Sequence, residues 1–392
     1  MDRWKKYKIG DICTRICSGG TPKSTESAYY GGNIPWLNTK EINFNQIYKT
    51  ERCITQSGLD NSSAKWIESD SVIVAMYGAT AAKIAINKIP LTTNQACCNL
   101  TINKTIADYR YVYYYLCNNY SLLASLANGG AQQNLNAQQI KDFKITLPPL
   151  AEQKRIAAIL GALDDKIELN RRINANLEEQ AKAFYKSWFV DFEPFNGILP
   201  NNWNVKLLGE ICSCELGGTP NRNISEYWGG NIPWINSGEI NQFRITKPSE
   251  MISELGLKKS ATKLLPPKTI VLAITGATLG QVSLLEIASC TNQSVVSIKP
   301  NEFIPYEYIY PYIKTNINKL ISCQTGGAQQ HINRQNVEKL NILLPDKEIM
   351  RKYVNAVSGI YALIANKCFE NESLTTLRDT LLPKLMNGEI NI

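Results

Sequence analysis

The sequence predicts an α+β protein in which two copies of a mixed α/β domain are joined by two long antiparallel coiled-coil helices, with pseudo-two-fold symmetry. Two observations lead to this fold class. Short motifs recur in the same order in the two halves of the chain. A long helical pattern follows each copy, and the first of these patterns carries apolar residues at the three- and four-residue spacing of a coiled coil.

The internal repeat consists of matched motifs separated by an offset of 198 residues, which one deletion shortens to 197 toward the end of the copy. The matched motifs are GGTP at 19–22 and 217–220, GGNIPW at 31–36 and 229–234, Gly-Ala-Thr at 78–80 and 276–278, and GGAQQ at 129–133 and 326–330. Two collinear repeats of this length indicate a duplicated domain rather than a solenoid.

The first copy, residues 1–147, has the pattern of a mixed α/β domain in which strands dominate. Residues 71–77 (SVIVAMY) form an apolar run that ends in Gly-Ala-Thr, which is typical of a buried strand followed by a turn. Residues 108–126 have a helical pattern that opens at Asp108. We expect the five tyrosines between 109 and 115 to pack this helix rather than to stack on bases.

The first long helix is predicted over residues 148–192. The proline pair at 148–149 suits a helix start, and Pro194 and Gly197 end the pattern. Two asparagines in an apolar seam reduce stability and usually select register and partner, so we expect a specific mate. The predicted seam comprises Leu160, Leu163, Ile167, Asn170, Asn174, Leu177, Ala181, Phe184 and Trp188.

The second copy, residues 193–344, repeats these features with an apolar strand at 269–275 and a helix at 306–321. A second long helix follows over residues 345–392. Its ladder is looser and shifts register once, through Val354, Val357, Tyr361, Ile364, Cys368 and Asn371 and then Leu374, Leu377 and Leu381. This helix is the natural mate of the first, and the short link at 191–202 favours antiparallel packing.

Composition excludes several classes of protein. The chain of 392 residues is 44% hydrophobic and 19% charged, with neither an N-terminal signal pattern nor an apolar run long enough to cross a membrane, so we expect a cytoplasmic protein. Eleven cysteines without a CxxC pair, and one histidine, predict no metal site. The net charge of +8 is a mild bias toward a polyanionic partner.

Motifs for catalysis and nucleotide binding are missing from the sequence. It contains neither a GxSxG elbow nor HExxH, and its glycine-rich loops match neither GxxxxGK[ST] nor GxGxxG. Glu41 and Glu239 occupy matched positions, but both stand beside isoleucine in what we interpret as loop packing. We therefore predict a protein that is not an enzyme and that binds no cofactor of its own.

The motifs, the helix opening PLAEQKRIAAIL and the terminal LLPKLMNGEI together resemble the specificity subunit of type I restriction-modification systems. The resemblance covers essentially the whole chain. It implies that each copy is a target recognition domain, which reads one half of a bipartite, asymmetric site in double-stranded DNA. The helices would space the two halves and dock two methyltransferase subunits. A restriction (translocase-nuclease) subunit would join the complex, and no membrane would be involved.

Candidate DNA-binding residues follow from comparing the two copies. Positions that are identical serve the shared fold or the phosphate backbone, whereas polar loop positions that differ can read different bases. The glutamines of GGAQQ can bond the edge of adenine, although a polar helix start at Asn136 and Asn333 explains them equally well. The candidates are Lys23, Ser24, Lys40, Tyr77, Thr80, Lys83, Gln132, Gln133 and Asn134 in the first copy, and Asn221, Arg222, Lys258, Thr278, Gln281, Gln329, Gln330 and His331 in the second.

Two other functions remain open on this reasoning. One is an enzyme, such as a nuclease or methyltransferase with an unfamiliar site, which the missing motifs disfavour. The other is a protein-interaction scaffold built on the coiled coil, without DNA. Divergence between the loops of the two copies favours a reader of two different DNA sequences, because a symmetric scaffold would not need it.

Overall fold

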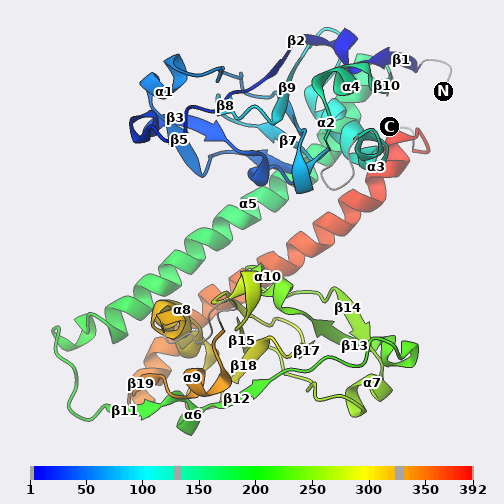
Figure 1. The fold of residues 1–392 in the computed structure, drawn as a ribbon. Coiled ribbons are helices and arrows are strands. Elements are labelled where there is room, and N and C mark those ends of the chain that lie inside the picture. The colour runs from blue at the N-terminus through cyan, green and yellow to red at the C-terminus, as the bar shows by residue number, and fades with distance from the viewer. Residues whose placement is uncertain (1–3, 128–133, 323–330, 391–392) are drawn as a thin grey trace. The chain divides into compact units, whose positions relative to one another are not determined.

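The computed structural model describes residues 4–127, 134–322 and 331–390. The chain forms two compact units, one of residues 1–165 with 374–392 and the other of residues 166–373. Each unit therefore contains one copy of the repeated domain together with a segment of both long helices (Figure 1).

The first copy is built on the sheet β2-β9-β6-β7-β4, beside the smaller sheets β5-β3-β8 and β1-β10. Central strand β6 carries Val-Ile-Val-Ala and is buried along its whole length, as the sequence predicts. The strands are β1 (Lys5–Lys8), β2 (Cys13–Ser18), β3 (Tyr30–Leu37), β4 (Asn45–Ile47), β5 (Arg52–Ile54), β6 (Val72–Ala75), β7 (Ile84–Asn87), β8 (Thr92–Thr93), β9 (Cys97–Ile102) and β10 (Lys144–Leu147).

Short helices pack on the sheets of the first copy and on one another. Asp108 caps α2 by accepting hydrogen bonds from two backbone N–H groups of the first turn, which confirms the predicted helix start. Tyr111, Tyr113 and Tyr114 are buried in the core, so the tyrosine run packs the helix as expected. The helices are α1 (Gln56–Asp60), α2 (Tyr109–Asn118), α3 (Tyr120–Ser125) and α4 (Ala137–Asp142).

The second copy repeats this topology, which confirms the duplication. Its sheet β12-β18-β15-β16 matches β2-β9-β6-β7, and β14-β13-β17 matches β5-β3-β8, while β11 pairs with β19. The elements are β11 (Asn204–Leu207), α6 (Leu208–Ile211), β12 (Ser213–Leu216), β13 (Trp228–Ile235), β14 (Glu250–Ile252), α7 (Glu254–Lys258), β15 (Ile270–Ala273), β16 (Val282–Leu284), β17 (Cys290–Thr291), β18 (Val295–Lys299), α8 (Tyr306–Ser322), α9 (Arg334–Glu338) and β19 (Asn341–Leu344).

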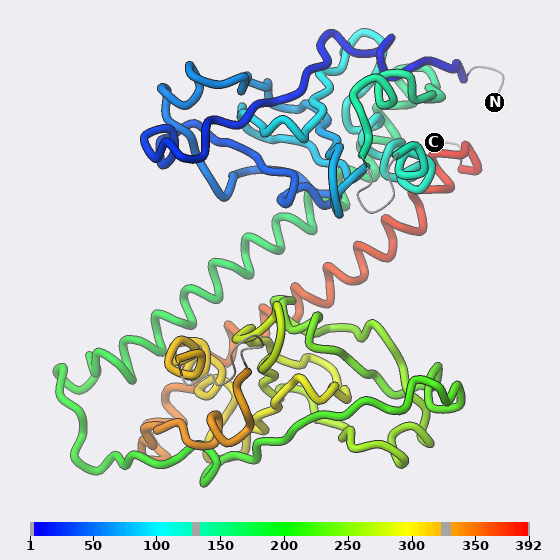
Figure 2. Tube along the Cα trace, in the orientation of Figure 1, coloured from blue at the N-terminus to red at the C-terminus, as the bar shows by residue number. Residues whose placement is uncertain are grey.

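The long helices are α5 (Leu150–Phe189) and α10 (Lys347–Met386), each of 40 residues and so about 60 Å long. Figure 2 allows the chain to be followed through α5 in green and α10 in orange to red. The Asn170 amide donates to Oδ1 of Asn371 at 2.9 Å, and the Asn174 amide lies 3.3 Å from Sγ of Cys368. Because residue numbers rise on one helix as they fall on the other, the pair is antiparallel, and the seam asparagines find the predicted mate.

The predicted seam is wrong at two positions. Phe184 is 38% exposed and Leu377 is 47% exposed, whereas Tyr185 and Phe189 are buried. From Ala181 onward α5 packs on the core of the second copy rather than on a supercoiled partner. The buried face there follows the four-residue spacing of a straight helix, and a strict 3-4 pattern does not continue.

Each domain core is completed by the helix that follows the other copy. Leu385 and Met386, near the end of α10, belong to the core of the first copy. Tyr185 and Phe189, near the end of α5, belong to the core of the second copy. In the part of the chain that the structure describes, no helix is long and apolar enough to span a bilayer.

Candidate nucleic-acid interface

Hydrogen bonds join four loops of the first copy into one group, here called the first loop cluster (residues 19–24, 76–80, 93–96 and 134–136). Thr21 Oγ1 is hydrogen-bonded to the side chain of Gln95. The N–H of Met76 donates to the carbonyl of Ala96, and the carbonyl of Met76 accepts from Leu135, both at 2.8 Å. The cluster therefore brings together five candidate positions that are far apart in the sequence: Lys23, Ser24, Tyr77, Thr80 and Asn134.

The second copy builds the same frame, here called the second loop cluster (residues 217–222, 274–278, 291–294 and 331–333). Thr219 Oγ1 is hydrogen-bonded to Gln293 at 2.5 Å. The N–H of Ile274 donates to Ser294, and its carbonyl accepts from Ile332, both at 3.0 Å. The shared threonine and glutamine thus fix the frame, and the side chains that differ are carried on it.

Two of the divergent pairs meet inside these clusters. Tyr77 forms an isolated β-bridge with Asn134, and at the equivalent place Thr275 forms one with His331. The Tyr77 side chain is 44% exposed, so its ring is available for contact with a ligand. Each copy consequently presents a different pair of side chains from the same backbone geometry.

The helix starts beyond these bridges are capped as the alternative interpretation of GGAQQ expects. Asn136 accepts a hydrogen bond from the N–H of Gln139, and Asn333 accepts one from Asn336. These caps account for the asparagines and leave the roles of the glutamines untested. The four candidate glutamines lie outside the described residues: Gln132, Gln133, Gln329 and Gln330.

The remaining candidates lie on neighbouring segments. Lys40 is exposed in the single turn η3 (Thr39–Glu41), which Asn38 caps. Lys83 donates to Oδ1 of Asn43 at 2.8 Å, while the equivalent Gln281 is only partly exposed. Lys258 is exposed at the last residue of α7.

The matched carboxylates close turns. Glu41 accepts hydrogen bonds from the N–H groups of Asn38 and Glu51, and Glu239 accepts them from Asn236 and Ser249. Burial raises the pKa of Glu41, although these two backbone donors act in the opposite direction. The geometry agrees with loop packing rather than with paired acid and base.

Comparison of the sequences identified Arg222 as a candidate but missed Arg52 of the first copy. In the second copy, the Arg222 guanidinium pairs with Glu250 through two hydrogen bonds and lies 3.8 Å from the ring centre of Trp228. The hydrogen bond to Glu250 raises the pKa of Arg222. The residues equivalent to Arg222 and Glu250 in the first copy are Ser24 and Arg52. Each copy thus supplies one arginine at these equivalent positions, Arg222 from a loop of the second copy and Arg52 from strand β5 of the first.

The Arg52 side chain is exposed on β5 of the first copy. In the second copy the arginine is neutralised by Glu250, whereas the first copy has no acid at the equivalent of that position. Arginine opposite glutamate at an offset of 198 was the signal in the sequence that could have identified this position.

Comparisons with known proteins identify the family to which the chain is similar. The family model described as the type I restriction modification DNA specificity domain matches residues 1–179 and 200–375. The type I restriction enzyme MjaIX specificity subunit of Methanocaldococcus jannaschii is 27% identical over 409 residues, which cover 99% of this chain and 94% of that protein. The HindI specificity subunit of Haemophilus influenzae is 24% identical over 467 residues, which cover 100% of both proteins.

A solved structure supports the fold. The crystal structure of a type I restriction-modification system S subunit from M. genitalium matches with a TM-score of 0.59, covering 97% of this chain and 96% of that chain. Sequence identity between the two is 18%, so this likeness shows the shared fold alone.

Proposed function

This chain belongs to the family of type I restriction-modification specificity subunits, and we propose from this premise that its two copies read the two halves of a bipartite, asymmetric sequence in double-stranded DNA. In this proposal residues 1–147 and 193–344 are the target recognition domains. The helical segments 148–192 and 345–392 set the spacing between the half-sites.

The observation that carries the proposal is one backbone frame with two sets of side chains. The first loop cluster joins Tyr77 to Asn134, and the second joins Thr275 to His331. Asparagine can bond the N6 and N7 positions of adenine, whereas threonine and histidine present other donors, acceptors and methyl groups to base edges. Divergent side chains on a shared frame are what two readers of different half-sites require.

The chemistry would reside in other subunits. In the proposed complex two methyltransferase subunits bind the helices, and a restriction (translocase-nuclease) subunit joins them, so that this chain supplies specificity without catalysis or a cofactor. Exposed apolar side chains on the helices of the second unit support such a contact, because water-exposed apolar surface is typical of protein interfaces: Leu169, Leu363 and Phe369. The DNA substrate would place this complex in the cytoplasm.

The test is single-molecule mapping of methylated adenine in genomic DNA from a host that expresses this chain with a type I methyltransferase subunit. We expect methylation in a split motif. Replacing residues 203–344 by those of another specificity subunit should change one half of that motif and leave the other unchanged. A stable complex that methylates no split motif, or a replacement that changes both halves, would contradict the proposal.

A further inference from the structure

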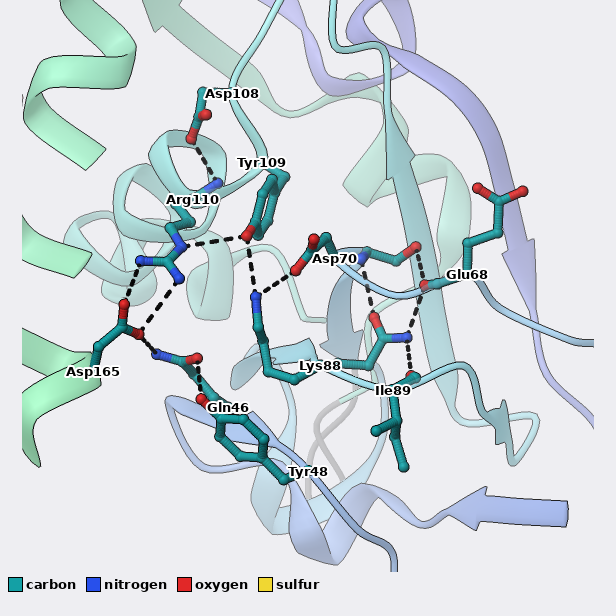
Figure 3. A network of polar contacts seen from close by, with 12 residues as sticks. Gln46, Tyr48, Glu68, Asp70, Lys88, Ile89, Asp108, Tyr109, Arg110 and Asp165 are labelled. Carbon is teal, nitrogen blue, oxygen red and sulfur yellow. Dashed lines mark hydrogen bonds and ion pairs between the residues drawn. The ribbon is translucent and has the colours of Figure 1, made fainter. Parts of the chain in front are cut away.

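The first copy is held on α5 by a charged network of Gln46, Arg110 and Asp165, which Figure 3 shows. These residues and Gly161 of α5 are here called the first helix interface. Arg110 forms two hydrogen bonds to the Asp165 carboxylate, at 2.9 and 3.4 Å. Gln46 donates to the same carboxylate at 3.1 Å. The domain thus reaches one acidic residue of the helix from two of its own elements.

Gly161 of α5 leaves the space that the Arg110 guanidinium occupies. A Cβ atom on Gly161 would lie 2.3 Å from Nη1 of Arg110. Because a Cβ atom does not come within 3.0 Å of a non-bonded heavy atom, a side chain at 161 would require the guanidinium to move. The helix surface of the first helix interface is therefore shaped, as well as charged, for this arginine.

The second copy uses a different set of residues, here called the second helix interface (Arg244, Tyr310, Lys314 and Glu178). Glu178 of α5 accepts a hydrogen bond from Lys314 at 2.7 Å and one from Tyr310 at 3.1 Å, and its other oxygen lies 3.3 Å from Nη2 of Arg244. The side chains of Arg244 and Glu178 are 1% and 16% exposed. A carboxylate this deeply buried depends on the two cations that the domain supplies.

The domain residues of the two networks can be aligned through the repeat, although both carboxylates, Asp165 and Glu178, lie on α5. Tyr111 and Tyr308 fix the alignment, because their hydroxyls donate to the backbone of the equivalent residues Thr146 and Leu343. With this alignment, the charge differs at five domain positions in and around the networks, whereas Tyr310 corresponds to Tyr113. The equivalent pairs are Gln46 and Arg244, Asp70 and Lys268, Lys88 and Glu286, Arg110 and Glu307, and Cys117 and Lys314.

At one pair of positions inside the domain, the acidic and basic residues of an ion pair are exchanged between the two copies. Lys88 is paired with Asp70 in the first copy, and Lys268 with Glu286 in the second. The two lysines stand at opposite ends of the equivalent pairs, yet each lies over the tyrosine that begins the following helix, at 5.2 and 5.3 Å from the ring centre. Inverted pairs inside the domains set the electrostatic surroundings of the two arginines that reach α5.

We propose that these networks assign each recognition domain to its own position on the helices: each domain carries the charges that its own helix carboxylate requires, and lacks those required at the other interface. The first copy placed at the second interface would offer Gln46 and Cys117 in place of Arg244 and Lys314. Glu178, which is only 16% exposed, would then lose both of the cations that contact it here, and loss of the partners of a largely buried charge strongly destabilises a protein.

The reverse exchange is also unfavourable. The second copy placed at the first interface would bring Glu307 to the position of Arg110, so the ion pair with Asp165 would be lost and a second carboxylate would approach it. Arg244 would partly offset this charge. The second interface, where both cations disappear, therefore gives the sharper test.

The test compares the parent chain with a chain that carries the first copy at both positions, made by replacing residues 203–344 by residues 4–147. We expect the melting temperature of the chain with two first copies to lie below that of the parent by roughly 6–20 °C, because it contains an unpaired buried charge. Hydrogen exchange along residues 350–364 should locate the loss in the second unit.

The substitution Glu178→Gln separates this explanation from poor packing. In the parent it removes the carboxylate that Arg244 and Lys314 share, although Arg244 keeps its contact with Glu286, and should lower the melting temperature. In the chain with two first copies it removes the unpaired charge and should raise the melting temperature. Glu179→Gln, at an exposed neighbouring residue, is the matched control and should change neither chain.

A second rescue places Gln46→Arg and Cys117→Lys together in the inserted copy, which returns both cations to Glu178. The proposal would be overturned if the parent chain and the chain with two first copies had equal melting temperatures. It would also be overturned if Glu178→Gln lowered the melting temperature of both chains. If the chain with two first copies does not fold, and neither Glu178→Gln nor the pair Gln46→Arg and Cys117→Lys restores folding, the proposal is also overturned. The measurement reads stability alone, so its failure would leave the proposed DNA-reading function intact.

Discussion

At the scale of single residues, the two loop clusters separate framework from variable side chains. Thr21 with Gln95, and Thr219 with Gln293, make the same hydrogen bond in both copies. The positions of Asn134 and His331 share a backbone geometry and differ only in chemistry. Substitution at these two positions is therefore a direct test of which copy reads which half-site.

We expect Asn134→Ala to relax base preference in one half-site and His331→Ala to relax it in the other, each at about 1–3 kcal/mol of discrimination. Methylation mapping of the assembled complex measures both halves in one experiment. Uniform weakening of both half-sites by either substitution would assign these residues to general binding rather than to base recognition.

Glycine at 161 supports a second prediction at this scale. In a helix interior, alanine is more favourable than glycine by about 1 kcal/mol. Gly359 of α10 has open space around it, so Gly359→Ala should raise the free energy of unfolding by about that amount. Gly161→Ala should lack this gain, because its methyl group would displace Arg110. Thermal unfolding of both variants measures the contrast.

The control for this prediction is the same substitution in an Arg110→Gln background. Without the guanidinium of Arg110, Gly161→Ala should raise the melting temperature, as Gly359→Ala does. If Gly161→Ala stabilised the unmodified chain as much as Gly359→Ala does, the close contact with Arg110 would not be what keeps glycine at this position.

At the scale of elements, the antiparallel helix pair depends on polar contacts in an apolar seam. Asn170 is fully buried, and its amide donates to Asn371. Such a contact contributes less to stability than to the choice of register, since an apolar pair of similar volume would pack at least as well.

We expect Asn371→Leu alone to destabilise the chain by about 1–3 kcal/mol, because the buried amide of Asn170 loses its partner. Adding Asn170→Leu should restore stability or raise it above the parent. Chemical denaturation measures both, and analytical ultracentrifugation shows whether the doubly substituted seam also accepts other partners. A single substitution without effect would mean that water satisfies Asn170.

The sequence predicted elements better than it predicted their surroundings. The repeat followed from motif spacing, the existence of a specific mate for the first long helix from its two seam asparagines, and the antiparallel packing from the short link at 191–202. The buried face at the end of α5 did not, because Tyr185 and Phe189 are buried by the second copy, a contact that the local 3-4 spacing around Phe184 does not encode. Local apolar periodicity predicts the buried face of a helix only where the helix packs against one partner along its whole length.

The candidate site was predicted in part for a similar reason. Divergence between copies pointed to Tyr77 and Asn134, which the fold brings together, but it treated Arg222 as a single position. Its pairing with Glu250 joins a loop to β14, and the exposed Arg52 replaces that acid in the first copy. A comparison of pairs of positions, rather than of single positions, would be needed to find such an exchange.

At the scale of the whole molecule, neither domain is complete within its own copy. Leu385, which is 1% exposed, and Met386 close the core of the first copy from the last turns of α10. The residues that finish this domain thus come more than 230 positions after its last strand, β10 (Lys144–Leu147).

Removal of residues 381–392 should therefore open the first domain while sparing the second unit. We expect faster proteolysis within residues 4–147, with little change within residues 204–344, as read by limited proteolysis and mass spectrometry. A chain that ends at residue 388 keeps both core side chains and serves as the control. Equal protection of the first domain in the two truncated chains would show that α10 is dispensable for its core.

Closure of the first domain by the end of α10 also sets an order of events during synthesis. The ribosome makes the first domain early, but Leu385 and Met386, which seal its core, are made only after the whole second copy, so this domain stays unfinished until then. A prematurely terminated product exposes an open core to cellular proteases. Only a chain that extends through Met386, and therefore contains both copies, would have a closed first core and be protected from them.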